Sequence, residues 1–314
     1  MDLIERAAEK LKQASGESLV ERAVEKIGDA APKPDDTAAG VASESGKTGE
    51  VGAKTAAPTV TPIEPAREAR SSRQISIDLD DLSKRGFIVP GGPQTRIAEE
   101  FRIIKRQLLL KAFGGLSQGD RSNIIMVTSA QPGEGKTFSS INLAMSIASE
   151  RDLTVLLIDA DVARPQLLKT LGVEAGTGLV DAIVDNDVTM ADCLLRTNVE
   201  NLTLLPAGKP HPLATELLAS ERMGQIIDEI AKRYSDRVVI FDSPPVLASS
   251  ATSVLALHVG QVLFVVETDR TKETQVTESL SLINGCKDIK LMLNKAGFDM
   301  GKDRFGAYYG YDHA

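Results

Sequence analysis

A glycine-rich stretch in the middle of the chain has residue types suited to holding phosphate. It runs from Ala130 to Thr137 as AQPGEGKT and matches the phosphate-binding loop except at Ala130, where that loop has glycine. Gly133 and Gly135 let backbone N–H groups turn toward phosphates, Lys136 can reach the β- and γ-phosphates, and the Thr137 hydroxyl can bind Mg²⁺. We therefore expect ATP to contact the following residues: Gln131, Pro132, Gly133, Glu134, Gly135, Lys136, Thr137 and Phe138.

Three carboxylates follow two other apolar runs. Asp159 and Asp161 come at the end of VLLIDAD, and Asp242 ends VVIFD. Two acids spaced by two residues at a strand end point the same way, which suits Mg²⁺ binding and acceptance of a proton from a hydroxyl. One such Asp alone is commonly a helix cap or turn former. Three of them near a phosphate-binding loop predict a catalytic group.

The C-terminal segment carries a cluster of tyrosines. Three of the four tyrosines, Tyr308, Tyr309 and Tyr311, lie among the last seven residues, next to glycines. Glycine favours a flexible segment, and a mobile terminus gives tyrosines little to pack against. We predict a flexible tail over residues 301–314, with docking of its aromatic rings on a neighbouring surface as the alternative.

The elements that must position these residues alternate along the chain. The predicted strands are the apolar runs Ile124–Val127, Val155–Ile158, Leu202–Leu205, Val238–Phe241, Val262–Val266 and Lys290–Leu293. Helical spacing is found in Phe138–Ser149, Arg222–Arg233 and Thr271–Ile283. This alternation predicts an α/β fold of the P-loop NTPase type, with a mostly parallel sheet buried between helices on both faces. Ligands bind beyond the carboxyl ends of the strands in such folds.

Composition changes along the chain and predicts four regions. Residues 1–28 contain the related stretches LIERAAEKL and LVERAVEKI, which predict amphipathic helices that either pack against a partner or remain solvated. Residues 29–74 are rich in Ala, Pro, Gly, Ser and Thr and predict a disordered linker. A folded ATP-binding domain is expected over residues 75–300, followed by the tail.

The overall composition excludes several classes of protein. With 36 basic and 44 acidic residues among 314, the net charge of −8 gives no reason to expect nucleic acid as a partner. Cys193 and Cys286 lie outside any metal-binding spacing, so we expect buried thiols in a reducing compartment. No apolar run approaches the roughly 18 residues needed to span a bilayer, and we expect the chain to be cytoplasmic.

The chain resembles the bacterial tyrosine kinases of exopolysaccharide assembly, especially their stand-alone form from exosortase loci. The resemblance is carried by the stretches TSAQPGEGKT, DADVARP and FDSPP and by the tyrosine cluster. The resemblance extends from near Arg85 to the end of the chain. It implies that Lys136 and Thr137 hold phosphates and Mg²⁺, and that Asp159 and Asp161 bind metal and activate the tyrosine hydroxyl. Asp242 would complete the metal site.

Other segments extend this resemblance. Asn294 follows a predicted strand where the family holds adenine. The residues Glu99, Arg102 and Lys105 resemble the family's ExxRxxR oligomerisation helix with lysine in its last position, although an ordinary solvated charged face has the same spacing. One departure is Ala163, which stands where the family has arginine, with Arg164 one position later.

The resemblance implies an ATP-dependent protein-tyrosine autokinase. It would phosphorylate its own tail in trans within a homo-oligomer and regulate exopolysaccharide export with a membrane-bound polysaccharide co-polymerase that recruits it to the inner membrane. Two alternatives are a MinD/ParA-like switch ATPase and an inactive scaffold. The switch ATPases carry a lysine where this chain has Gln131, and they lack a tyrosine tail.

Overall fold

A mostly parallel sheet of eight strands forms the centre of the computed structural model, which describes residues 73–114, 121–233 and 237–297. The strand order is β1-β4-β5-β3-β6-β2-β7-β8, and only the pairing of β4 with β5 is antiparallel. The strands are β1 (Arg73–Gln74), β2 (Ile124–Ser129), β3 (Thr154–Asp159), β4 (Leu195–Arg196), β5 (Leu202–Leu205), β6 (Arg237–Asp242), β7 (Gln261–Glu267) and β8 (Ile289–Asn294).

All six predicted strands are present as the continuous parallel block from β5 to β8, and the predicted fold class is confirmed. The two-residue strands β1 and β4 were not predicted, because so short a segment has no hydrophobic periodicity to detect. The predictions for residues 1–28, for most of the linker and for the tail lie outside the described residues.

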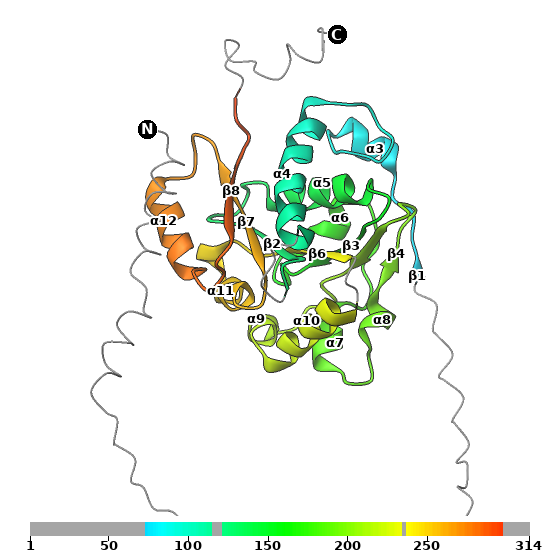
Figure 1. Cartoon of the computed structure of the whole chain (residues 1–314). Coiled ribbons are helices and arrows are strands. Elements are labelled where there is room, and N and C mark those ends of the chain that lie inside the picture. Colours follow the sequence, from blue (N-terminus) through cyan, green and yellow to red (C-terminus); the bar gives the residue numbers. More distant parts are fainter. Residues whose placement is uncertain (1–72, 115–120, 234–236, 298–314) are drawn as a thin grey trace, which may run out of the picture. The chain divides into compact units, whose positions relative to one another are not determined.

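Helices cover both faces of the sheet. Figure 1 shows α4 and α5 on one side and α9, α10 and α11 on the other. The bounds are α3 (Leu79–Lys84), α4 (Arg96–Phe113), α5 (Lys136–Ala148), α6 (Leu167–Thr170), α7 (Leu179–Val184), α8 (Met190–Cys193), α9 (Ala214–Leu218), α10 (Glu221–Arg233), η1 (Val246–Ala248), α11 (Ser250–Ala256) and α12 (Glu273–Leu282). The three segments of predicted helical spacing correspond to α5, α10 and α12.

The central strands are fully buried, as a parallel sheet between two helical layers requires. Every residue of β2 is buried, and so are the last five residues of β3 and of β6. The expectation of burial on both faces is wrong for β8, where Leu293 is 40% exposed. Because β8 is the last strand in the order, it has a neighbour on one side only.

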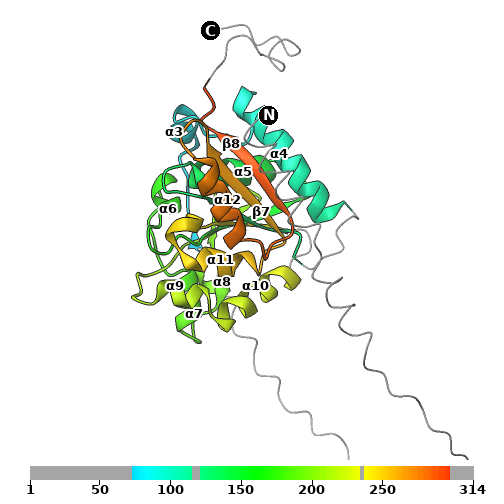
Figure 2. The same cartoon turned by 90° about the vertical axis from the view of Figure 1, so that its left-hand side faces the viewer.

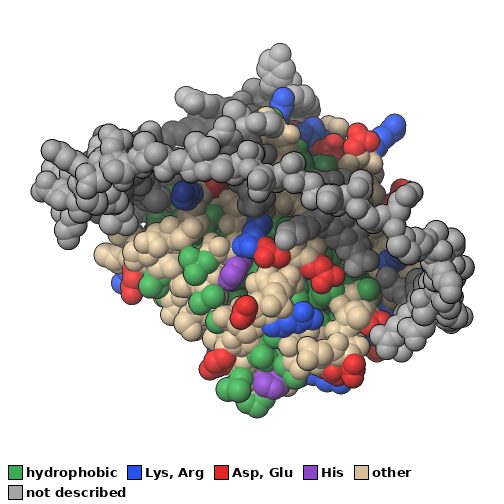
Figure 3. All heavy atoms as spheres, turned by 60° about the horizontal axis from the view of Figure 1, so that its bottom comes forward, with side chains coloured by type: hydrophobic (Ala, Val, Ile, Leu, Met, Phe, Trp, Pro, Cys, Tyr) green, Lys and Arg blue, Asp and Glu red, His purple; other side chains and the backbone are tan. Residues whose placement is uncertain are grey.

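Helix α4 forms an outer layer over α5. It buries Phe101 and Leu108 in the core shared with α5, and Figure 2 shows it along the margin of the molecule. The opposite face, which carries α7, α9 and α10, has acidic, basic and hydrophobic side chains interspersed (Figure 3).

Two further expectations were tested by the fold. Cys193 and Cys286 are buried free thiols, as predicted. Across the ranges that the structure describes, no helix combines the length and the apolar character needed to cross a membrane.

Candidate active site

The phosphate-binding loop joins β2 to α5 at the carboxyl edge of the sheet. Gly133 and Gly135 have positive φ angles of 87° and 99°, and Gly135 is the residue from which α5 begins. The first N–H groups of a helix lack partners within it, so the start of α5 offers them to an anion. Lys136, in the first turn, is 8% exposed. The sequence folds this way because glycine alone takes these φ angles without strain.

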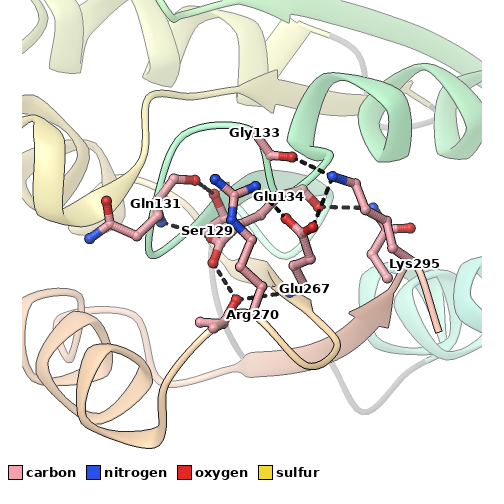
Figure 4. A network of polar contacts seen from close by, with 9 residues as sticks. Ser129, Gln131, Gly133, Glu134, Glu267, Arg270 and Lys295 are labelled. Carbon is pink, nitrogen blue, oxygen red and sulfur yellow. Dashed lines mark hydrogen bonds and ion pairs between the residues drawn. The ribbon is translucent and has the colours of Figure 1, made fainter. Parts of the chain in front are cut away.

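Glu134 closes the loop from within. Its carboxylate accepts a 2.7 Å hydrogen bond from the backbone N–H of Gln131 and another from the Thr271 hydroxyl, and the residue is 1% exposed (Figure 4). The backbone carbonyl of Gln131 accepts a 2.9 Å hydrogen bond from the Ser129 hydroxyl. The Glu134 side chain is therefore engaged inside the protein, and a nucleotide contact from this residue would come from its backbone.

The ends of β7 and β8 support the same loop from outside (Figure 4). Asn294 donates its side-chain amide to the Glu134 carbonyl at 2.8 Å. Lys295 donates to the Gly133 carbonyl at 2.8 Å and pairs with Glu267 at 3.2 Å. Arg270 also pairs with Glu267, at 3.0 Å. Of these residues the sequence analysis identified only Asn294. Glu267 ends β7, Arg270 lies three residues later, and Lys295 directly follows β8. Position at the end of a predicted strand is the signal that identified the aspartates, and it could have found these residues.

Asp159 and Asp242 lie side by side at the ends of neighbouring strands. They are register partners in the β3–β6 ladder, and each is 1% exposed. Asp159 accepts backbone N–H groups from Asp161 at 3.2 Å and from Leu167 at 3.1 Å. Asp242 accepts a 3.1 Å hydrogen bond from the Ser140 hydroxyl on α5. The fold thus joins two carboxylates that are 83 positions apart in the sequence to the helix that follows the phosphate-binding loop.

Burial dominates the electrostatics of this carboxylate group. Desolvation, reinforced by the charge of Asp242, raises the pKa of Asp159 to about 8. Desolvation also raises the pKa of Asp242 to about 6, although the Thr137 hydroxyl and the charge of Lys136 act in the opposite direction. Burial also raises the pKa of Asp161, although the charge of Lys136 acts in the opposite direction. A site that disfavours negative charge in this way favours a cation as its ligand.

The oxygen donors around Asp242 fit Mg²⁺. Within the described ranges, no group of three His, Cys, Asp or Glu residues could hold a metal ion on its own. Mg²⁺ in phosphoryl-transfer sites takes only one or two carboxylates and completes its shell with water and phosphate oxygens. Asp242 with the neighbouring Thr137 and Asp159 would supply the protein's share.

Phe138, a predicted nucleotide-binding residue, contributes differently from expectation, and the structure also places Arg164. The Phe138 ring packs against the ring of Phe87, with centroids 4.9 Å apart, so its nucleotide contact would come from the backbone. Arg164 is exposed and donates its backbone N–H to Asp161 at 3.2 Å.

The three residues of the predicted oligomerisation motif lie on α4. Glu99 and Arg102 form an ion pair of 2.8 Å. Lys105, however, is 8% exposed, donates to the Ser146 carbonyl at 2.7 Å and pairs with Glu150 at 2.5 Å. Its ammonium group is therefore bound within its own chain. Tyr308, Tyr309 and Tyr311 lie outside the described residues.

A parallel sheet with a phosphate-binding loop and paired aspartates at its carboxyl edge defines a P-loop NTPase. The AAA domain family matches residues 122–295, more than half of the chain. The tyrosine-protein kinase YwqD of Bacillus subtilis is 29% identical over 227 residues, which are 72% of this chain and 92% of YwqD. The tyrosine-protein kinase Wzc of Salmonella typhimurium is 29% identical over 235 residues, which are 74% of this chain but only 31% of Wzc.

Solved structures agree with these relatives. The kinase domain of the Escherichia coli tyrosine kinase ETK is similar, with a TM-score of 0.56 and 26% identity over 71% of this chain and 91% of that domain. The kinase domain of VpsO has a TM-score of 0.53 and 28% identity, covering 65% of this chain and 100% of that domain. The chain belongs to the AAA domain family and to the bacterial tyrosine kinases. Its activity class is that of a protein-tyrosine kinase.

Proposed function

We propose that this kinase uses ATP and Mg²⁺ to phosphorylate the tyrosines of its own C-terminal tail, in trans within a homo-oligomer. The observation that carries the proposal is the pairing of Asp159 with Asp242 in register, beside the helix that begins at Lys136. This arrangement supports two tasks at one edge of the sheet, since one carboxylate can face a metal while the other faces an acceptor hydroxyl.

In the reaction, the phenol oxygen of a tail tyrosine attacks the γ-phosphorus of ATP. The bond from that phosphorus to the β–γ bridging oxygen breaks, and ADP leaves with the electron pair. A cation bound beside Asp159 would offset the burial that raises its pKa and favour the ionised form. The ionised Asp159 orients the hydroxyl and accepts its proton, while Lys136 and the N–H groups at the start of α5 hold the phosphates. Mg²⁺, when bound, would neutralise part of the phosphate charge. Asp161 supports Asp159 by donating its backbone N–H.

Mass spectrometry of the purified chain after incubation with Mg·ATP tests the proposal. We expect phosphate on Tyr308, Tyr309 or Tyr311, loss of that label in Lys136→Ala, and retention in Lys84→Ala, which removes an exposed lysine elsewhere. Hydrolysis of ATP without a labelled tyrosine would instead favour a switch ATPase.

A mixing experiment tests the trans reaction. A Lys136→Ala chain with an intact tail is mixed with an active chain that lacks residues 301–314. Label on the inactive chain supports transfer between copies, and its absence contradicts it. Each phosphate adds up to about −2 charges, which should repel the tail from the acidic site and loosen the oligomer.

The partner and location follow from the resemblance described above. We place the kinase in the cytoplasm, recruited to the inner membrane through residues 1–28 by a membrane-bound polysaccharide co-polymerase, in control of exopolysaccharide export. Deletion of residues 1–74 should abolish partner binding and retain ATP binding. Loss of ATP binding would show that the domain boundary at residue 75 is wrong.

A further inference from the structure

Three charged residues form a cluster against the phosphate-binding loop. They are Glu267 at the end of β7, Arg270 three residues later and Lys295 directly after β8, and we name them the Glu267 cluster. The Glu267 carboxylate pairs with Arg270 at 3.0 Å and with Lys295 at 3.2 Å (Figure 4). One carboxylate therefore holds two cations beside a loop that is suited to binding phosphates.

The two cations of the cluster are held to different degrees. Lys295 has a second partner, because its ammonium group also donates to the Gly133 carbonyl at 2.8 Å. The Arg270 side chain is 60% exposed, and within the described part of the chain Glu267 is its only ion-pair or hydrogen-bond partner. An ion pair with so exposed a cation contributes little to stability. The Arg270 guanidinium can therefore change partners at a small cost.

The same guanidinium lies next to the phosphate-binding loop. A Cβ atom at Gly133 would lie 3.5 Å from Nη1 of Arg270, and Figure 4 shows the Arg270 side chain directed toward the loop. Only Nη1 contacts Glu267, so the other guanidinium nitrogens keep their N–H donors. The planar arrangement of these donors matches the oxygens of a phosphate group. Arg270 thus has both the position and the donors to bind a nucleotide.

We propose that Arg270 exchanges its ion pair with Glu267 for a phosphate of the bound nucleotide, and that Glu267 competes with the nucleotide for this guanidinium. The inference rests on the proposed function, because it takes ATP as the nucleotide. A phosphate chain carries more negative charge than one carboxylate, which favours the exchange. Lys295 remains paired with Glu267 afterwards, so no carboxylate of the cluster is left without a cation.

The direction of one effect separates this exchange from simple support of the loop. If the cluster only supported the loop, Glu267→Gln would weaken nucleotide binding. The exchange predicts the opposite, because Glu267→Gln releases Arg270 and should strengthen binding about 2- to 5-fold, the size of an exposed ion pair. Arg270→Ala should weaken binding about 10-fold, the size of a hydrogen bond between charged groups.

Isothermal titration of the full chain with ADP and with a non-hydrolysable ATP analogue measures these affinities. The matched control is Glu100→Gln, which removes the carboxylate of the Arg96–Glu100 ion pair on α4 and should leave the affinity unchanged. Unchanged or weaker binding in Glu267→Gln would overturn the proposal, and so would wild-type affinity in Arg270→Ala.

The double variant tests whether the gain depends on Arg270. Removal of a negative charge near phosphates could by itself strengthen binding, without any exchange of partners. With Arg270→Ala already present, Glu267→Gln should therefore give no further gain in affinity. A gain of the same size in both backgrounds would show that the charge of Glu267 alone is responsible and would contradict the exchange.

Nucleotide affinity also separates this inference from kinase activity, because the titration requires no phosphoryl transfer. Mass spectrometry of the same proteins after incubation with Mg·ATP reports tyrosine labelling. If Glu267→Gln binds more tightly than wild type and Arg270→Ala more weakly, but wild type labels no tyrosine, only the proposed function is contradicted. If wild type labels its tyrosines and all three proteins bind nucleotide equally, only the exchange is overturned.

Discussion

The side-chain amide of Asn294 donates a 2.8 Å hydrogen bond to the Glu134 carbonyl and so joins the end of β8 to the phosphate-binding loop. Along the chain the loop follows β2, which lies two strands away from β8 in the order. Removal of this hydrogen bond should therefore increase the mobility of the phosphate-binding loop without lowering the stability of the fold.

We predict that Asn294→Ala weakens ATP binding about 2- to 10-fold, because a hydrogen bond contributes roughly 0.5–1.5 kcal/mol. Titration with a fluorescent ATP analogue measures the change. Asn201→Ala is a matched control, since its amide donates to the Glu150 carbonyl at 2.9 Å before the start of β5, away from the site. If Asn294→Ala and Asn201→Ala lose the same affinity for ATP, the hydrogen bond from Asn294 to the loop has no specific effect on binding.

Gly135 should not tolerate a side chain. A Cβ there would lie 2.0 Å from the Asn294 amide nitrogen, at a φ of +99°. We expect Gly135→Ala to abolish nucleotide binding, measured by the same titration. Gly172→Ala is the control, because Gly172 also has a positive φ but nothing lies within 4 Å of its Cβ position. If steric overlap contributes, Gly135→Ala with Asn294→Ala should regain part of the binding.

Stability without nucleotide should fall as the pH rises. The folded chain holds protons on Asp159 up to about pH 8, whereas the unfolded chain releases them near 3.8. Between these values the folded state binds more protons, so rising pH favours unfolding. Urea midpoints at pH 6.5 and pH 8.5 should show a decrease that Asp159→Asn reduces. The exposed carboxylate variant Asp185→Asn should keep the wild-type decrease, and an unchanged decrease in Asp159→Asn would contradict this explanation.

Lys105 and Arg102 should have separate effects although they share α4. Lys105→Ala leaves the Ser146 carbonyl and Glu150 without their ammonium partner, so we expect a loss of about 1–3 kcal/mol in the free energy of unfolding. Arg102→Ala, with a side chain that is 55% exposed, should change stability by less than about 1 kcal/mol. Urea denaturation measures both. Sedimentation then tests whether Arg102→Ala alone weakens self-association, as the motif predicts.

The sequence by itself determined the six long strands, the helix after the phosphate-binding loop and the aspartates at the strand ends. These features are local, because buried strands need continuous apolar runs and a tight loop needs glycine. The spacing of Gly133, Gly135 and Lys136 was therefore sufficient to locate the loop.

Only the tertiary structure decided which distant residues meet. Strand order is set by packing of the whole chain, so no local pattern could place Asp159 beside Asp242, or Asn294 and Lys295 against the loop. The sequence also did not determine which side chains of α4 are buried. Lys105 and Arg102 have the same helical context, yet the Lys105 ammonium group is buried against α5 and the Arg102 side chain is exposed. A pocket of about 290 Å³ beside Asp159 is lined by segments after β3 and β5, and it exists only because these two strands are neighbours in the sheet.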